Sequence, residues 1–111
     1  NGIQVINKEK EKNMIKHLSN ENFNDEIQGK TILVDFYADW CGPCKMMGTV
    51  LENVTAIDIL KVNVDEHNDI AAKYGIMSIP TLMIFKDNKE VTKVVGYRSQ
   101  DEIEQIINEN K

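Results

Sequence analysis

The feature that most constrains the fold is a continuous apolar run at residues 32–34, Ile-Leu-Val. A strand that is apolar on both sides, rather than alternating, needs helices over both faces of its sheet. Helix-spaced apolar residues follow this run, and a second apolar strand is predicted at 57–64. Strand, helix and strand in this order predict a parallel crossover, with residues 32–34 in the central strand. The helix-spaced residues are Met46, Met47, Val50, Leu51 and Val54.

Two shorter elements are predicted before the central strand. Residues 15–18 indicate a short strand, and Ser19 is a suitable N-cap for the helix that follows it. Phe23 and Ile27 share one face of that helix, which ends at residues 29–30. The alternation of strands and helices therefore begins near residue 15.

The C-terminal half completes the sheet. Its predicted elements are, in order, a helix at 68–74 closed by Gly75, two strands at 81–85 and 91–95, and a final helix. Turn formers at 87–89 indicate that the two strands form an antiparallel hairpin. Ser99 and Glu102 fit a capping box at the start of the final helix, whose buried stripe is Ile103, Ile106 and Ile107. We predict an α/β fold with a central mixed sheet of four or five strands, flanked by helices on both faces.

The chain length favours one compact domain. With 111 residues, of which 41% are hydrophobic, two domains would each lack a core. We place the domain at residues 14–111 and interpret residues 1–13, which carry a charge run, as a flexible appendage rather than an extra edge strand. No apolar stretch approaches the roughly 18 residues of a membrane-spanning helix, so we expect no membrane association.

Charge and cysteine content bear on partners and location. A net charge of −5, from 18 acidic and 13 basic residues, disfavours nucleic acid, whose phosphates attract clustered Lys and Arg. No charged segment followed by an apolar one precedes the domain, as it would in a secretory signal. The two cysteines are too few for the disulfide framework of a small secreted scaffold. We therefore expect a cytoplasmic protein that binds no nucleic acid.

Both cysteines belong to one motif, Trp-Cys-Gly-Pro-Cys at residues 40–44, between the central strand and the next helix. Pro43 fits the first turn of that helix, which places Cys41 at the helix N-terminus. Unpaired amides and the helix dipole stabilise an anion there and lower the thiol pKa below its free value of about 8.5. Helical residues three apart lie about 5 to 6 Å apart at Cβ, within reach of a disulfide after a small adjustment. Cys44 can therefore displace a sulfur that has become bonded to Cys41.

Three other readings of the cysteine pair are possible. A structural disulfide that closes so small a loop would remove little chain entropy. A zinc site would need two more ligands, and His17 and His67 are not spaced as a ligand pair. The third alternative is an inert pair in a redox-independent binding module.

Asp35 and Lys61 are candidates for acid–base chemistry. Asp35 interrupts an apolar strand, where it shares a face with Leu33 and Tyr37. Burial would raise its pKa and make it a candidate base for the Cys44 proton, through water. Alternatively, Asp35 is a carboxylate satisfied near the end of the strand. Lys61, on the neighbouring strand, can pair with Asp35 or remain exposed at an edge.

Three segments together resemble the thioredoxin family: residues 34–46 (VDFYADWCGPCKM), 74–76 (YGI) and 79–82 (IPTL). The resemblance extends from about Ile15 to the C-terminus and includes the order of elements. It implies a thioredoxin fold and a reductase of protein disulfides, in which Cys41 attacks a client disulfide and Cys44 displaces the reduced client. The pair Gly42-Pro43 is the one found in the reducing members of the family. A thioredoxin reductase as electron donor, no bound cofactor and a monomer are expected.

The resemblance also implies roles for further residues. It assigns the base to Asp35 and favours its pairing with Lys61. It implies a cis Ile79-Pro80 bond, although most X-Pro bonds are trans. It also places this loop beside Cys41, where the Ile79 backbone can form hydrogen bonds with an extended client segment, as an added strand would. The apolar rim around the sulfur would consist of Trp40, Gly42, Pro43, Ile79 and Gly96, with Tyr97 as a weaker candidate that is equally consistent with ordinary packing.

The methionines are interpreted chiefly as core. Met46 and Met47 belong to the helical stripe and Met83 lies in an apolar strand, where thioether side chains fill gaps. Met77 and Ser78 lie next to the expected client loop and are expected to tune client choice.

The chain departs from the family pattern after the motif. Residues 44–64 are shorter than usual by more than one helical turn of about 3.6 residues. Thr49 stands where a helix-kinking proline is common, and Gly48 costs about 1 kcal/mol of helix preference relative to alanine. Lower stability is therefore expected. Tyr37 replaces a frequent tryptophan, a change that leaves the site intact.

Overall fold

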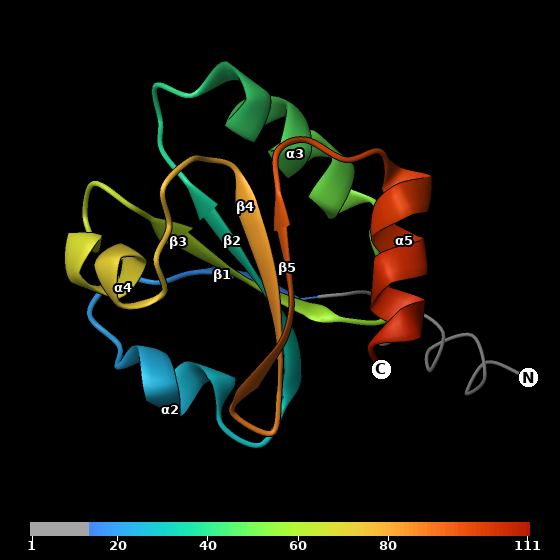
Figure 1. Cartoon of the computed structure of the whole chain (residues 1–111), viewed down its shortest axis with the longest axis horizontal. Helices are drawn as coiled ribbons and strands as arrows, with labels where there is room; N and C mark the ends of the chain where they lie inside the picture. The colour runs from blue at the N-terminus through green and yellow to red at the C-terminus, as the bar shows by residue number, and fades with distance from the viewer. Residues whose placement is uncertain (1–13) are drawn as a thin grey trace, which may run out of the picture.

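The computed structural model describes residues 14–111, and the predicted appendage at 1–13 lies outside the described residues. Within residues 14–111 nine elements follow one another in the predicted order, and their five strands form one mixed sheet in the order β1-β3-β2-β4-β5 (Figure 1). The strands are β1 (Ile15–His17), β2 (Thr31–Tyr37), β3 (Asp58–Asn63), β4 (Thr81–Lys86) and β5 (Lys89–Val95). The helices are α2 (Phe23–Ile27), α3 (Gly42–Glu52), α4 (Asn68–Lys73) and α5 (Gln100–Glu109).

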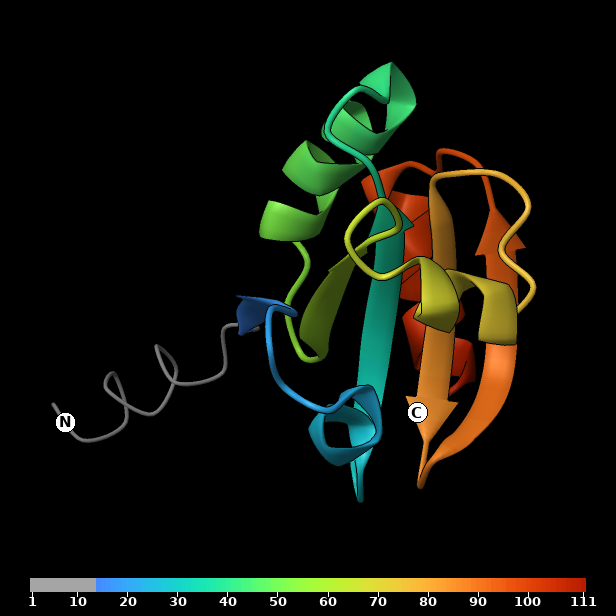
Figure 2. The same ribbon diagram turned by 90° about the vertical axis from the view of Figure 1, so that its left-hand side faces the viewer.

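Two helices cover each face of the sheet. On one face α2 and α4 pack against Val34 and Phe36 of the central strand β2, and on the other α3 and α5 pack against Leu33 (Figures 1 and 2). Because side chains alternate along a strand, the run at 32–34 supplies both cores. The predicted fold class and central strand are confirmed, and the sheet has five strands.

The strand register positions the site. Strand β2 pairs parallel with β3, which places Asp35 opposite Lys61, and antiparallel with β4. Strand β1 pairs parallel with β3, which places His17 opposite Lys61 as well. The chain leaves β2 at Tyr37 and enters α3 at Gly42, so the cysteine motif lies at the carboxyl end of the central strand.

Helix α2 begins three residues later than Ser19 predicts. Asn22 is its N-cap, with the side-chain oxygen accepting a hydrogen bond from the Asp25 amide at 3.2 Å. Ser19 instead donates its backbone N–H to the Glu21 carboxylate at 2.8 Å. Both Ser and Asn are good N-caps, and the residue followed directly by the buried Phe23 is the one that caps.

The remaining turns and caps agree closely with the sequence. The Ser99–Glu102 capping box is present, and Gly75 ends α4 with a φ of 66°. The hairpin turn consists of Asp87 and Asn88, both with positive φ, whereas Lys89 already belongs to β5. Two consecutive residues with positive φ suit the twist of a tight hairpin.

The segment after the motif consists of helix α3 and a short connection to β3. Helix α3 ends at Glu52, and β3 begins six residues later. Within the connection Ala56 has a φ of 71°, a left-handed conformation that costs free energy for a residue with a Cβ.

Met47 is fully buried as predicted, but Met46 is 57% exposed, so its assignment to the core is wrong. Adjacent helical residues point about 100° apart and cannot both face the sheet.

Candidate active site

Cys41 lies at the N-terminus of α3, as predicted. It is the N-cap residue with extended backbone angles, and Pro43 follows in the first turn. The Cys41 Sγ accepts a hydrogen bond from the Cys44 backbone N–H, with N and S 3.2 Å apart. This donor, together with the positive end of an 11-residue helix, stabilises negative charge on the sulfur.

Cys41 and Cys44 form a disulfide with their Cα atoms 5.2 Å apart. The two sulfurs are therefore within bonding reach with the first turn of α3 formed, and Cys44 is positioned to resolve a mixed disulfide on Cys41. Both cysteines are largely buried and pack against Ala38. Within residues 14–111 no cluster of three or more His, Cys, Asp or Glu side chains could hold a metal ion.

Asp35 is fully buried on the face of the sheet that carries α3. Burial raises the pKa of its carboxyl, and the positive charges of Lys61 and, more weakly, His17 oppose this rise. The Lys61 Nζ lies 3.1 Å from Asp35 Oδ2, which confirms the predicted pairing. Within the described chain the carboxylate has no hydrogen-bond donor other than this ammonium. An incompletely satisfied buried carboxylate with a raised pKa is suited to taking up a proton.

Cys41 opens into a hollow of about 510 Å³. The motif forms one wall and the loop before β4 forms the other. The Ile79-Pro80 bond is cis, as the resemblance implied, and the Ile79 carbonyl oxygen lies 4.0 Å from the Cys41 sulfur. The lining residues are Trp40, Cys41, Gly42, Pro43, Val64, Ile76, Met77, Ser78 and Ile79.

The predicted rim residues Gly96 and Tyr97, and the client-loop residue Pro80, do not line this hollow. Pro80 is buried behind the loop, and the Gly96 N–H donates to the Pro80 carbonyl at 2.8 Å. Gly96 therefore supports the loop from the β5 side. Tyr97 is 41% exposed and also lies outside the lining, whereas Met77, at 94% exposure, is available to any molecule that enters.

Asp65 is a site residue that the sequence interpretation missed. Its carboxylate accepts a hydrogen bond from the Trp40 indole N–H at 2.9 Å. Trp40 is 71% exposed, so this bond fixes the orientation of an otherwise free ring beside the disulfide. A signal was present, because Asp65 follows β3 at the same sheet edge where β2 leads into the motif.

Cys44 lines a different cleft, of about 460 Å³, whose lining shares no residue with that of the Cys41 hollow. Lys61, Tyr37 and His17 line this cleft together with Gly48 of α3. Burial, and the negative charges of Asp39, Glu66 and Asp35, raise the pKa of the Tyr37 hydroxyl. That hydroxyl therefore remains protonated at neutral pH. The cleft gives water a route to the second cysteine.

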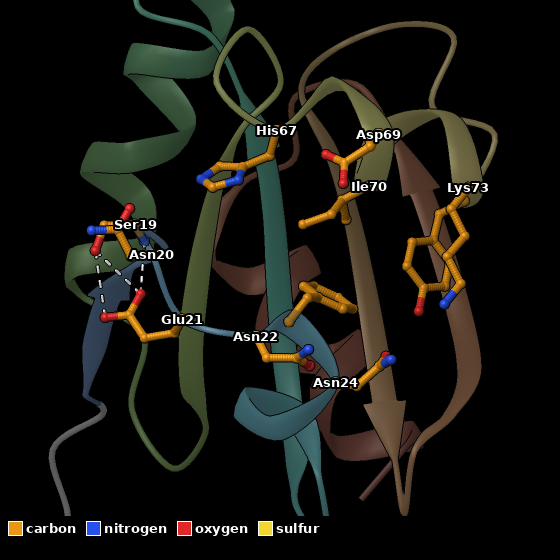
Figure 3. A pocket seen from close by; sticks show the side chains of 11 residues that line it. Ser19, Asn20, Glu21, Asn22, Asn24, His67, Asp69, Ile70 and Lys73 are labelled. Carbon is orange, nitrogen blue, oxygen red and sulfur yellow. Dashed lines mark hydrogen bonds between the residues drawn. The ribbon is translucent and has the colours of Figure 1, made fainter.

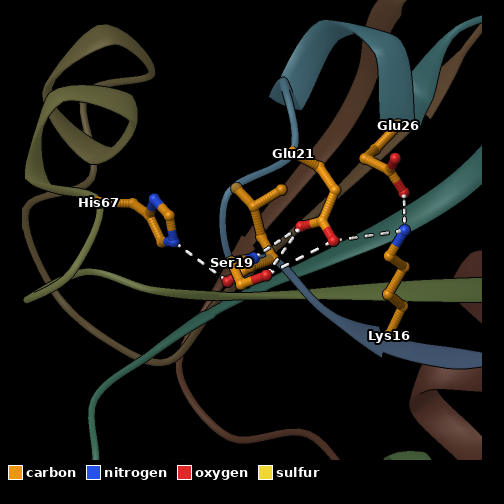
Figure 4. Close-up of polar contacts among 6 residues, drawn as sticks. Lys16, Ser19, Glu21, Glu26 and His67 are labelled. Atoms are coloured by element: carbon orange, nitrogen blue, oxygen red, sulfur yellow. Dashed lines mark hydrogen bonds and ion pairs between the residues drawn. The ribbon is translucent and has the colours of Figure 1, made fainter.

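A third hollow, of about 450 Å³, lies between residues 19–24 and helix α4 (Figure 3). Its lining is mainly polar and contains no cysteine. Next to it, the His67 Nε2 contacts the Leu18 carbonyl oxygen at 3.1 Å, and the Lys16 ammonium pairs with Glu26 at 2.9 Å (Figure 4). These contacts fix the end of β1 against the rest of the domain.

The comparisons with known proteins agree with this geometry. A family model, Thioredoxin, matches residues 14–109. The chain belongs to the thioredoxin family. It is 48% identical over 101 residues to a thioredoxin of Chlamydia caviae, covering 87% of this chain and 99% of that protein. A thioredoxin of Staphylococcus saprophyticus is 46% identical over 98 residues, covering 84% of this chain and 94% of that protein.

Solved thioredoxins have the same fold. A thioredoxin from Nicotiana alata superposes with a TM-score of 0.79 at 35% identity, covering 91% of this chain and 96% of that one. A mutant thioredoxin from Halobacterium salinarum gives a TM-score of 0.77 at 32% identity, covering 86% and 89%. Family membership and the Cys41–Cys44 disulfide together make this protein a thiol–disulfide oxidoreductase. None of the helices in residues 14–111 is long and apolar enough to cross a membrane.

Proposed function

We propose that this thioredoxin reduces disulfides of client proteins, with Cys41 as the attacking thiolate. The observation that carries the proposal is that Cys41 lines the apolar hollow beside the Ile79 loop, whereas Cys44 lines a separate cleft. The Cys41 thiolate attacks one client sulfur, the client disulfide breaks, and the other client sulfur leaves as a thiolate. Cys44 then attacks Cys41, the mixed disulfide breaks, and the client leaves with two reduced sulfurs.

Asp35 is the base for the second displacement. As the bond between the two cysteines forms, the Cys44 proton passes through water in the cleft to the Asp35 carboxylate. The raised pKa of Asp35 supports this role, because it gives the carboxylate a proton affinity closer to that of a thiol. Lys61 opposes the rise in the pKa of Asp35 and so favours the ionised carboxylate, the form that can act as a base.

An extended client segment binds along the hollow. The Ile79 backbone offers hydrogen bonds in the manner of an added strand, while Trp40, Gly42 and Pro43 contact the client from the motif side. Pro80 and Gly96 hold the Ile79 loop in place from behind. Met77 and Ser78, on the loop wall, tune which clients fit.

The cycle leaves Cys41 and Cys44 oxidised, so two electrons must be returned to this pair. A thioredoxin reductase is the donor that the family membership supports, and no bound cofactor is needed on this chain. We place the protein in the cytoplasm as a monomer. The net charge of −5 supports protein clients rather than nucleic acid.

Reduction of insulin disulfides by dithiothreitol tests the proposal. The native chain should accelerate the reaction, Cys41→Ser should not, and Cys44→Ser should hold clients covalently on Cys41 because resolution is blocked. Equal acceleration by the native chain and Cys41→Ser, with no trapped client, would instead indicate a redox-independent binding module.

The reduction potential of the pair tests the direction of transfer. A reductant should have a potential of about −270 mV, whereas a disulfide-forming enzyme has one of about −120 mV. A value at the oxidising end would contradict the proposed direction. This measurement is independent of any particular client.

A further inference from the structure

Four polar side chains form a strip across one end of the sheet, on the face that carries α3. His17, Lys61 and Asp35 are in register on β1, β3 and β2, so their side chains leave the same face in a row. Tyr37, two residues beyond Asp35 on β2, shares that face. The strip runs from the exposed His17 to the fully buried Asp35.

The Lys61 ammonium is held between two groups of this strip. Its Nζ lies 3.1 Å from Asp35 Oδ2 and 4.7 Å from the centroid of the Tyr37 ring. An ammonium over an aromatic face is attracted by the ring quadrupole. The ring therefore favours the position of Nζ in which it contacts the carboxylate.

The Tyr37 ring is itself anchored. Its hydroxyl lies 3.1 Å from His17 Nδ1, and the two rings meet edge-on with centroids 6.0 Å apart. His17 is fixed in turn because the next residue, Leu18, donates its N–H to the Lys61 carbonyl at 2.9 Å and accepts from His67 (Figure 4). The hydrogen bond to His17 thus restrains the ring in the orientation that faces Lys61.

Helix α3 leaves space for the ammonium. A Cβ built on Gly48 would lie 3.3 Å from the Lys61 Nζ, closer than most such contacts. The backbone of Gly48 is helical, and glycine is a poor helix former, so the helix itself does not require this residue. The absence of a side chain at position 48 lets Lys61 lie between Tyr37 and Asp35.

We propose that Tyr37, anchored by His17 and opposite the open position at Gly48, is a positioning residue that holds the Lys61 ammonium on Asp35 during the resolving step. This inference rests on the proposed role of Asp35 as the base. Without the ring, Lys61 can turn into the cleft, and its charge then acts less on the carboxylate.

The consequence is a change in the pH at which Asp35 loses its proton. The charged groups that act on Asp35 are Lys61 on β3 and His17 on β1, Cys44 on α3 lines the same cleft as Lys61, and Asp39 and Glu66 act on Tyr37. Lys61 is the stronger of the two cations that lower the pKa of Asp35. A displaced ammonium therefore leaves Asp35 protonated up to a higher pH, and the base is lost at the acid end of the activity range.

The test is the rate of the resolving step as a function of pH. Reduced protein is mixed with Ellman's reagent, and the second thionitrobenzoate, released when Cys44 displaces it from Cys41, is followed by stopped flow. For Tyr37→Leu we expect the acid limb of the profile to move to higher pH, with the rate on that limb about two- to fivefold lower and the alkaline plateau unchanged.

A second variant covers the case in which Tyr37→Leu does not fold. Gly48→Val fills the space of the ammonium from α3 without removing a core side chain, and it should shift the limb in the same direction. Met46→Val is the matched control, because it places valine on an exposed part of the same helix outside the cleft, and it should keep the native profile.

Two results overturn the inference. In the first, the acid limb of both Tyr37→Leu and Gly48→Val lies at the same pH as that of the native protein. In the second, the resolving step of both variants is slowed by the same factor at every pH. Asp35→Asn separates this failure from failure of the proposed base. If Asp35→Asn removes the limb while the two positioning variants do not move it, only the inference is wrong. If Asp35→Asn leaves the limb in place, the role of Asp35 is wrong and the inference is rejected with it.

Discussion

Replacing Asp35 with asparagine should stabilise the oxidised protein at neutral pH. The carboxylate is fully buried, and its attraction to Lys61 at 3.1 Å is worth about 5 kcal/mol at an effective dielectric constant of about 20. Desolvation of a buried ion costs several kcal/mol, and the raised pKa shows that this cost exceeds the attraction. Lys61 lines a cleft and can reach water when its partner is removed. We therefore expect a gain in the free energy of unfolding of about 1.4 kcal/mol for each pH unit by which the folded-state pKa of Asp35 lies above 3.8.

The gain should depend on pH with a definite sign. Because folding raises the pKa of Asp35 above its ordinary value of 3.8, the stability linked to its proton is present below pH 3.8 and is lost as pH rises through the folded-state pKa. The native protein and Asp35→Asn should thus converge in acid and diverge toward neutral pH. Urea unfolding at a series of pH values measures this, with the exposed Asp39→Asn as control. A constant difference at every pH, or a less stable Asp35→Asn at pH 7, would refute the reasoning.

Three further changes have expected outcomes. Ala56→Gly should raise the free energy of unfolding by roughly 0.5 to 1 kcal/mol in urea titrations, because glycine adopts the positive φ without a Cβ penalty, and no gain would mean that the connection is unstrained. Ser99→Ala should lower the same quantity by about 1 kcal/mol through loss of the helix cap, whereas an unchanged midpoint would show the cap to be dispensable. Asp65→Ala should increase the mobility of Trp40, the single tryptophan, and lower its fluorescence anisotropy, so an unchanged anisotropy would indicate that the bond does not orient the ring.

The fold followed from the sequence wherever one local pattern determined the structure. The unbroken apolar run of β2 required helices on both faces, and the Ser99–Glu102 pair located the start of α5. The errors arose where two nearby residues were equally suited to the same role, either capping a helix or facing the core. Ser19 and Asn22 are both good N-caps, and only the packing of Phe23 distinguishes them. Met46 and Met47 are equally apolar, but Met47 lies one turn before Leu51 and therefore faces the sheet.

The strand–helix junction predicted the place of the cysteine pair. For Lys61 the sequence left pairing with Asp35 and exposure at an edge both open, and the family resemblance favoured the pair that the structure shows. The bond from Trp40 to Asp65 and the contact between Tyr37 and His17 were not predictable. Both join segments that are distant in sequence, and they depend on the path of a loop or on the pairing of an edge strand. No periodic pattern in the sequence predicts contacts of this kind.

The two cysteines line separate hollows at the start of α3. Sulfur exchange with a partner and proton exchange with solvent thus use separate entrances. A bulky polypeptide seated against the first sulfur leaves the water path to the second one clear. Substitutions among the residues that line the Cys41 hollow can therefore suit it to other clients without altering the Asp35–Lys61 pair that serves the Cys44 proton.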